Sequence, residues 1–493
     1  MHKISAMTGE RDLSQRVASG VAWNIAEKVG STLLQAIVSI IVANRIMPED
    51  MGIIAILTVF VTLTQVVIDS GFSQTLIRKA APTPGDFKAV FRFNLIAALV
   101  IYGALTATSP LIASYYGWEL ITDIAPVLYL LLPLNALCVI QNTIMVREFR
   151  FAELSTIIFF SSLISGILAI VMALTGFGIW SLVGQRVGMM ATKAVLLWYR
   201  SSWRPRRDVK CGSLREMAPF SLRLIATDMI TAIYNNIAQL FIGKIYSADS
   251  LGYFNQAQKL KDMPVNATMQ SIQSVTFPAL AKISDNEQKF DEGYRRVVML
   301  TAFIMLPIMA GLVATAEDIF HLLLRPQWHP SIPYFKVMCL IGIFYPISAI
   351  AYNVLKVRSN GRIILWMEII KKGIMTIILA VTIPMSVMAI AWGMVAASAC
   401  EMVLNVGATM RYAGLSIKRF IRTLLPIVLL TLVMYGATEC VGIYTQNWSV
   451  ALRLATKIAT GITIYAAIGF AARMEAFGEV LAIARQFANK IKR

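Results

Sequence analysis

The chain has 493 residues, of which 57% are hydrophobic and 15% are charged, and its formal net charge is +18. Soluble domains carry about a quarter charged residues, so this composition excludes an ordinary soluble protein. Apolar windows of about twenty residues, each long enough to cross a bilayer, recur along the chain and predict an all-α polytopic membrane protein. The five cysteines lie far apart and the three histidines offer no metal-site spacing, which predicts free thiols and no metal site.

Fourteen apolar segments are predicted to form transmembrane helices. They cover residues 17–45, 51–78, 88–109, 121–146, 151–175, 178–200, 214–245, 251–282, 292–317, 331–357, 361–383, 387–411, 417–442 and 450–473. The first sixteen residues are polar and contain Lys3, Arg11 and Arg16, which differs from the pattern of a cleavable signal peptide. The connections are short, which leaves no room for an extramembrane catalytic domain and predicts no catalytic residues.

Lysine and arginine alternate between rich and poor connections along the chain. Most of the 45 basic residues lie in the amino-terminal tail, the even-numbered connections and the carboxyl-terminal tail. Because basic residues accumulate in cytoplasmic loops, both termini are predicted to be cytoplasmic. The positive charge is then explained by loops beside anionic lipid, and no nucleic-acid partner is expected.

The turn after the first predicted helix resembles the turn after the seventh. Residues 44–52 read NRIMPEDMG and residues 243–252 read GKIYSADSLG. Both turns follow a helix that starts on the cytoplasmic side, so the two halves are predicted to be parallel repeats. The predicted organisation is a cytoplasmic tail (1–16), an amino-terminal lobe (17–200), a basic linker (201–213), a carboxyl-terminal lobe (214–411), two further helices (412–474) and an amphipathic cytoplasmic helix (475–493).

The eighth predicted helix carries a polar stripe. Six polar residues recur at steps of three or four and therefore share one helical face, and Pro264 is expected to kink the helix. They are Asn255, Lys259, Asp262, Asn266, Gln270 and Gln273. Each charge at mid-bilayer costs about 2.5–3.5 kcal/mol, so such residues must face the interior, pair or reach an interface. This stripe is expected to line a water-filled cavity.

Other intramembrane cations follow the same pattern. Lys28 on the first helix and Arg223 on the seventh also lie on polar faces, whereas Arg186 lies deep in the sixth helix. Lys28, Arg223 and Lys259 are candidates for binding substrate phosphates, and structural ion pairing is the alternative. Cations that line an apolar cavity suit a lipid-linked diphosphate, which needs charge-assisted donors.

The remaining intramembrane charges have less specific patterns. Asp69 and Asp228 are candidates for coupling a cation, and solvation at helix ends is the alternative. Three lysines are expected to extend to an interface or to pair locally; they are Lys193, Lys371 and Lys372. No cofactor is expected, although transport could be coupled to an ion gradient or to the membrane potential.

Several of these motifs resemble the polysaccharide-export flippases of the multidrug/oligosaccharidyl-lipid/polysaccharide superfamily, closest to the colanic-acid-type exporters. The resemblance rests on residues 19–23, 45–52, 69–78, 251–253 and 277–280. Ala257-Gln258-Lys259-Leu260 followed by Pro264 is also similar to the Ala-Asp-Arg-Leu pattern of the lipid II flippases, with Lys259 in place of their cavity arginine. Their first-helix basic residue has no counterpart at the matching position here, because Lys28 lies much earlier.

The resemblance implies two six-helix lobes in a V, two additional helices and alternating access in the bacterial inner membrane. It implies a transporter, not an enzyme, that flips an undecaprenyl-diphosphate-linked oligosaccharide for exopolysaccharide, O-antigen or capsule assembly. Membrane lipid, a polysaccharide polymerase and chain-length proteins are the other expected partners. The expected cavity residues are Lys28, Arg186, Arg223, Asn255, Lys259 and Asp262. The alternatives are a drug/cation antiporter of the same superfamily, a membrane glycosyltransferase or ligase, and a lipid scramblase.

Overall fold

A computed structural model of the protein describes residues 30–206, 209, 212–282, 286–358, 361–413 and 416–482. Within these residues the regular structure is helical throughout, and no strand is present. The chain divides into two compact units, Met1–Asn255 and Gln256–Arg493. The helix α9 (Ala248–Lys282) begins in the first unit and continues into the second.

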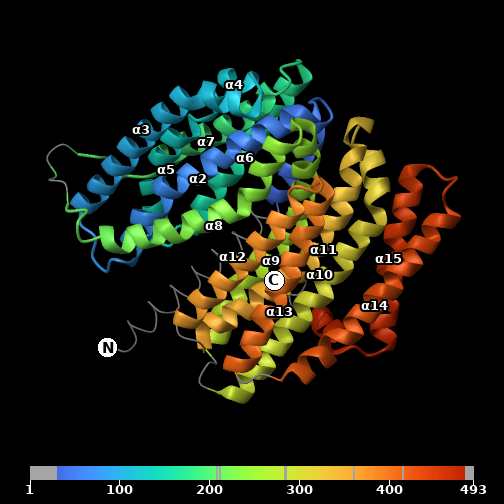
Figure 1. Ribbon diagram of the computed structural model, residues 1–493. Helices are drawn as coiled ribbons and strands as arrows, with labels where there is room; N and C mark the ends of the chain where they lie inside the picture. The colour runs from blue at the N-terminus through green and yellow to red at the C-terminus, as the bar shows by residue number, and fades with distance from the viewer. Residues whose placement is uncertain are drawn as a thin grey trace. The chain divides into compact units, whose positions relative to one another are not determined.

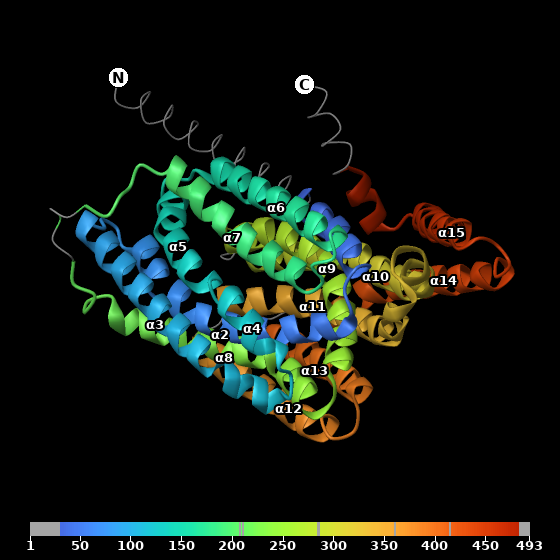
Figure 2. The same ribbon diagram turned by 90° about the horizontal axis from the view of Figure 1, so that it is seen from above.

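The first unit is drawn in blue to green in Figure 1 and is seen from above in Figure 2. Its helices are Gly30–Ala43, α2 (Pro48–Arg78), α3 (Pro84–Tyr116), α4 (Leu120–Leu128), α5 (Leu131–Arg147), α6 (Phe151–Leu174), α7 (Trp180–Arg200) and α8 (Ala218–Ile245). The helix α2 packs against α5 and α8, α5 packs against α7, and α7 packs against α6. Residues 53–57 of α2 are almost completely buried, so α2 forms the core of this unit.

The second unit is built around α11. Its helices after α9 are α10 (Glu287–Leu323), the short 3-10 helix η1 (Pro326–Ser331), α11 (Ile332–Arg358), α12 (Gly361–Thr382), α13 (Val387–Ala413), α14 (Ile417–Tyr444) and α15 (Val450–Ala471). The helix α11 packs against α10 and α13, α12 packs against α13, and α14 and α15 pack against each other and against α10. Phe335, Ile350 and Val354 place the apolar side of α11 in the core.

Local sequence signals set several helix boundaries. Thr83 caps α3 by accepting a hydrogen bond from the amide of Asp86, and the Asp86 carboxylate accepts one from the amide of Thr83 at 2.8 Å. Pro84 occupies the first position of α3, where its missing amide donor is not needed. Gly117 ends the helix with φ of 77°, a backbone conformation that glycine adopts without strain.

Nine helices in the described ranges are long and apolar enough to cross a membrane. Counting α4 and α5 as the single span Leu120–Arg147, the described helices follow the order of the predicted segments. The predicted segments outside the nine are Gly30–Ala43, α7, α8, α9 and α12. Four of these, α7, α8, α9 and α12, contain most of the charged residues that the sequence places inside the membrane. A multi-pass membrane protein is confirmed, and the count of fourteen crossings stays a prediction.

The two repeated turns lie against one another within the first unit. A Cβ atom added to Gly52 would lie 2.0 Å from the Ala248 carbonyl oxygen, and one added to Gly252 would lie 1.9 Å from the Pro48 carbonyl oxygen. Both positions therefore require glycine. Each repeat contacts the other through the same element, which supports the predicted internal repeat.

The division of the chain at residue 255 comes later than the predicted linker at 201–213. The reason is that α8 packs along α2 and the start of α9 meets the start of α2. The two compact units are defined by contacts within the chain. The predicted lobes are the parts expected to move during alternating access, so their boundaries stay a prediction.

Candidate functional site

A polar cluster joins α2, α5 and α7 inside the first unit. Asn135 on α5 donates a hydrogen bond from Nδ2 to Oδ1 of Asp69 on α2 at 2.5 Å. The ammonium group of Lys193 on α7 is near enough to interact electrostatically with the same carboxylate. Lys193 therefore interacts with an acid of another helix, whereas extension to an interface or a local pair was predicted. Asp69 contacts other helices of the bundle, whereas solvation at a helix end was the alternative. Asn135 was not predicted, although an asparagine in an apolar segment is a usable signal.

Arg186 lies on the same face of α7 as Lys193, because seven residues separate them. Its side chain is half-buried. Among the residues that the structure describes, its guanidinium makes no hydrogen bond and no ion pair. No described protein group thus satisfies this cation, which lies within an apolar helix of the first unit.

The polar face of α8 is exposed. Arg223, Thr227 and Thr231 follow one another at steps of four, and all three are exposed. The threonine hydroxyls donate to backbone carbonyl oxygens of α8 itself, from Thr227 to Arg223 at 2.9 Å and from Thr231 to Thr227 at 3.0 Å. The guanidinium of Arg223 has no hydrogen-bond or ion-pair partner in the described parts of the chain, and the alternative pairing with Asp228 does not form.

The stripe on α9 lies beside the buried face of that helix. The buried side chains include Phe254, Gln256, Ala257, Lys261 and Val265. Asn255, Lys259 and Asp262 are half-buried and Asn266 is exposed, so these positions lie on a less buried face. Asp262 forms an ion pair with the neighbouring Lys261, which partly neutralises one predicted cavity residue. Lys28, and the side chains of Gln270 and Gln273, lie outside the described residues.

A second charged cluster links three helices of the second unit. The Lys371 Nζ atom on α12 lies 2.5 Å from Oε1 of Glu368 and 3.4 Å from Oε1 of Glu401 on α13. The same atom lies 4.4 Å from the centre of the Tyr352 ring on α11, a distance typical of cation–π contact. Lys371 therefore pairs locally, as predicted, but its distant partner Glu401 was not predicted.

A buried ion triad joins α10 to α15. The Asp318 carboxylate is 1% exposed and accepts a hydrogen bond from Nε of Arg453. Its other oxygen lies 2.9 Å from Nζ of Lys457, which also donates to the Ala314 carbonyl oxygen at 3.0 Å. This triad holds α10 and α15 together, because the Asp318 carboxylate is paired with both cations of α15.

Arg186 and Arg223 are two cations within helices of the first unit. Within the described residues the buried lysines Lys261, Lys371 and Lys457 all have carboxylate partners. Arg186 and Arg223 do not. No group of three or more His, Cys, Asp or Glu side chains in the described ranges is placed to hold a metal ion.

Comparison with known proteins gives a consistent set of relatives. A family model described as polysaccharide biosynthesis protein matches residues 41–333. The teichuronic acid biosynthesis protein TuaB of Bacillus subtilis is 21% identical over 465 residues, which are 92% of this chain and 95% of TuaB. The succinoglycan biosynthesis transport protein ExoT of Rhizobium meliloti is 22% identical over 360 residues, with 73% and 72% of the two chains covered.

A solved structure shares the fold over nearly the whole length. The lipid II flippase MurJ in its inward closed conformation matches with a TM-score of 0.66 at 16% identity, covering 97% of this chain and 99% of that one. The similarity confirms the predicted fold class. At this level of identity it carries information on the fold alone.

Proposed function

Because this chain belongs to the polysaccharide biosynthesis protein family, we propose that it is a flippase for an undecaprenyl-diphosphate-linked oligosaccharide repeat. The repeat passes from the cytoplasmic to the periplasmic leaflet of the bacterial inner membrane, and both termini of the chain are cytoplasmic. The names of its relatives support this proposal, since TuaB is named for teichuronic acid biosynthesis and ExoT for succinoglycan biosynthesis transport.

The observation that carries the proposal is the pair of unpartnered arginines. A charge kept unpaired in an apolar helix costs several kcal/mol, and the buried lysines of this chain avoid that cost through carboxylate partners. Arg186 and Arg223 have no such partner in the described part of the chain. A guanidinium binds phosphate oxygens in a bidentate manner, so both side chains suit an anion that arrives and leaves.

In the proposed mechanism Arg223 and Lys259 hold the diphosphate head group with help from Lys28 or Arg186, and the lipid tail stays in the bilayer. The two lobes then rock to open the other side. Bound substrate shifts this equilibrium only through its different affinity for the two states. A polymerase with its chain-length proteins takes up the translocated repeat.

Coupling to an ion gradient or to the membrane potential is part of the same proposal. The Asp69 carboxylate is a suitable place for a proton or cation. Asn135 donates a hydrogen bond to this carboxylate and Lys193 interacts with it electrostatically. Loss of that charge would release both partners and change how α2, α5 and α7 are held together.

The test uses cells that lack this protein and receive the wild type, Arg223→Gln or Arg215→Gln. Arg215 is an exposed arginine in the turn before α8 and is the matched control. A hydrogen bond to a charged group contributes about 1.5–3 kcal/mol, so we expect the Arg223 variant to export at least about tenfold less surface polysaccharide at equal membrane levels. The lipid-linked repeat should accumulate on the inner leaflet.

The same cells distinguish the alternatives. Unchanged polysaccharide export after deletion would reject the flippase proposal. Loss of resistance to cationic drugs instead would indicate a drug/cation antiporter. Sugar transfer by the purified protein would indicate a glycosyltransferase or ligase. Normal export by Arg223→Gln would leave the flippase in place and remove this arginine from the substrate site.

A further inference from the structure

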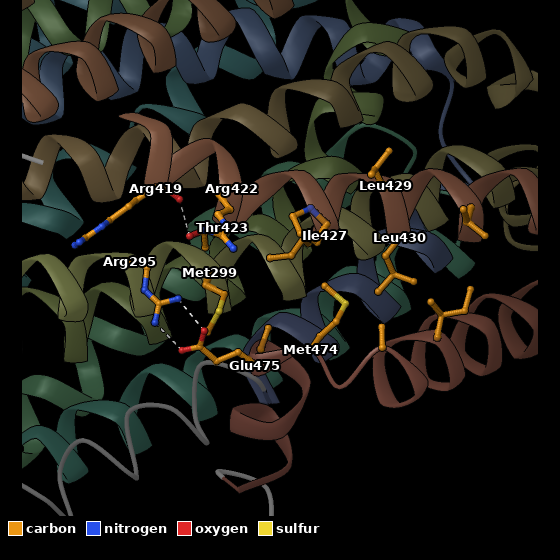
Figure 3. Close-up of a pocket in the computed structure, with 15 residues that line it drawn as sticks. Arg295, Met299, Arg419, Arg422, Thr423, Ile427, Leu429, Leu430, Met474 and Glu475 are labelled. Atoms are coloured by element: carbon orange, nitrogen blue, oxygen red, sulfur yellow. Dashed lines mark hydrogen bonds and ion pairs between the residues drawn. The ribbon is translucent and has the colours of Figure 1, made fainter. Parts of the chain in front are cut away.

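A pocket of about 670 Å³ opens in the second unit between α10, α14, α15 and residues 474–476. Figure 3 shows Arg295, Arg419 and Arg422 towards one end of the pocket and Leu429 and Leu430 towards the other. The volume lies in the range of about 300–1,000 Å³ that is typical of small-molecule sites. None of the residues discussed above as candidates for substrate binding lines it.

The arginine end of the pocket has one uncompensated charge. Arg295 forms two parallel hydrogen bonds of 2.7 Å with the Glu475 carboxylate. Arg419 pairs with Asp291 at 2.7 Å. Arg422 is exposed, and no partner for its guanidinium exists among the described residues. Two of the three lining arginines are thus paired with carboxylates, and Arg422 is left to pair with a negative charge on a ligand.

The pocket combines this charge with an apolar wall in a fixed order along α14. Arg422 lies in the second turn, whereas Leu429 and Val433 come later and are each 53% exposed. Eleven residues separate Arg422 from Val433, which is about 16 Å along a helix or about half of a hydrocarbon core. A phospholipid has the same order and the same spacing, with a phosphate at the interface and acyl chains beneath it.

We propose that this pocket binds an anionic glycerophospholipid of the surrounding membrane, distinct from the transported substrate. The phosphate of the head group pairs with Arg422, and an acyl chain follows Leu429 and Val433. A phosphodiester carries one negative charge, which Arg422 can neutralise, whereas a diphosphate carries more negative charge than this one arginine can neutralise. The apolar lining favours a lipid over free phosphate. The bound lipid bridges α14 and α15 and stabilises their packing on α10.

The experiment measures thermal unfolding of the purified, detergent-solubilised protein as a function of added lipid. A ligand that binds only the folded state raises the unfolding temperature in proportion to its occupancy. The probes are phosphatidylglycerol, phosphatidylcholine with the same acyl chains, undecaprenyl phosphate and inorganic phosphate. The variants are Arg422→Gln and Val433→Trp, which fills the apolar wall. Arg206→Gln removes an exposed arginine of the first unit that does not line the pocket, and it is the control.

We expect phosphatidylglycerol to raise the unfolding temperature and phosphatidylcholine to have a much smaller effect. Arg422→Gln should weaken phosphatidylglycerol binding about fivefold, the change expected for one basic residue beside anionic lipid. Val433→Trp should abolish the shift while its lipid-free unfolding temperature stays close to that of the wild type, since residue 433 is half-exposed. Arg206→Gln should bind as the wild type does.

Three results would overturn the proposal. Equal shifts with both phospholipids would show that the charge plays no part. An equal shift with inorganic phosphate would show that the acyl chains play no part in binding. Preferential, Arg422-dependent binding of undecaprenyl phosphate would assign the pocket to the polyprenyl carrier instead. No transported substrate is present, so each result leaves the proposed flippase activity untouched.

Discussion

The contact between the two repeated turns makes a strong prediction, because both glycines face backbone atoms. In Gly52→Ala the new Cβ would lie 2.0 Å from the Ala248 carbonyl oxygen, and ordinary contact would require a separation of about 3.4 Å. The two helix starts must therefore move apart by about 1.4 Å. The obstacle is main chain at the beginning of α9, so no side-chain rotation relieves it.

The energetic cost follows from measured overpacking. Forcing an extra methyl into a packed site costs about 1–3 kcal/mol, whereas alanine in an unobstructed helix is more stable than glycine by about 0.5–1 kcal/mol. We expect Gly52→Ala and Gly252→Ala each to lower the free energy of unfolding by about 1–2 kcal/mol. The double variant should cost less than the sum, because the displacement caused by the first methyl makes room for the second.

Thermal unfolding of the purified variants, followed by tryptophan fluorescence, measures these differences. Gly103→Ala in α3 is the control, since no atom lies within 4 Å of its added Cβ. It should be neutral or slightly stabilising. The reasoning fails if Gly52→Ala is as stable as Gly103→Ala, or if the two glycine substitutions are strictly additive.

Two further predictions concern charges of the second unit. Asp318→Asn removes a carboxylate that is 1% exposed and neutralises two cations, so it should lower the free energy of unfolding by about 3–5 kcal/mol. Asp291→Asn, whose partner is 71% exposed, should lower it by less than about 1 kcal/mol. Equal losses would contradict the structural role of the Asp318 triad. Arg295 lowers the pKa of Glu475 below its ordinary value of 4.5. This contact therefore contributes fully above pH 4.5 and is lost as the pH falls through the lowered pKa. Proteolysis at residues 474–482 should accelerate in that acidic range in the wild type but not in Glu475→Gln, and an identical pH profile would reject the role of the carboxylate.

The helices and their order could be predicted from the sequence because the bilayer imposes a minimum apolar length. The polar stripes on α8 and α9 could be predicted because helical periodicity alone decides which residues share a face. The repeat could be predicted from two similar turns, although their contact through Gly52 and Gly252 could not. Periodicity relates residues within one helix, and it contains no information on which helix lies opposite.

The ion-pair partners on other helices could not be predicted from the sequence for the same reason. Glu401 is 30 residues from Lys371, and Asp318 is 135 residues from Arg453, so each pairing depends on how whole helices are rotated and packed. A local pair such as Glu368 with Lys371 is visible from its i, i+3 spacing. Arg186 shows the limit of sequence reasoning, because an unpaired charge is recognised only once all its neighbours are known.

The glycine contact has the geometry of an isologous interface, in which each side presents the same element to the other. Gly52 meets the turn that contains Gly252, and Gly252 meets the turn that contains Gly52. This chain makes such a reciprocal contact between two parts of itself. A change in either turn therefore alters a surface that the other turn must match.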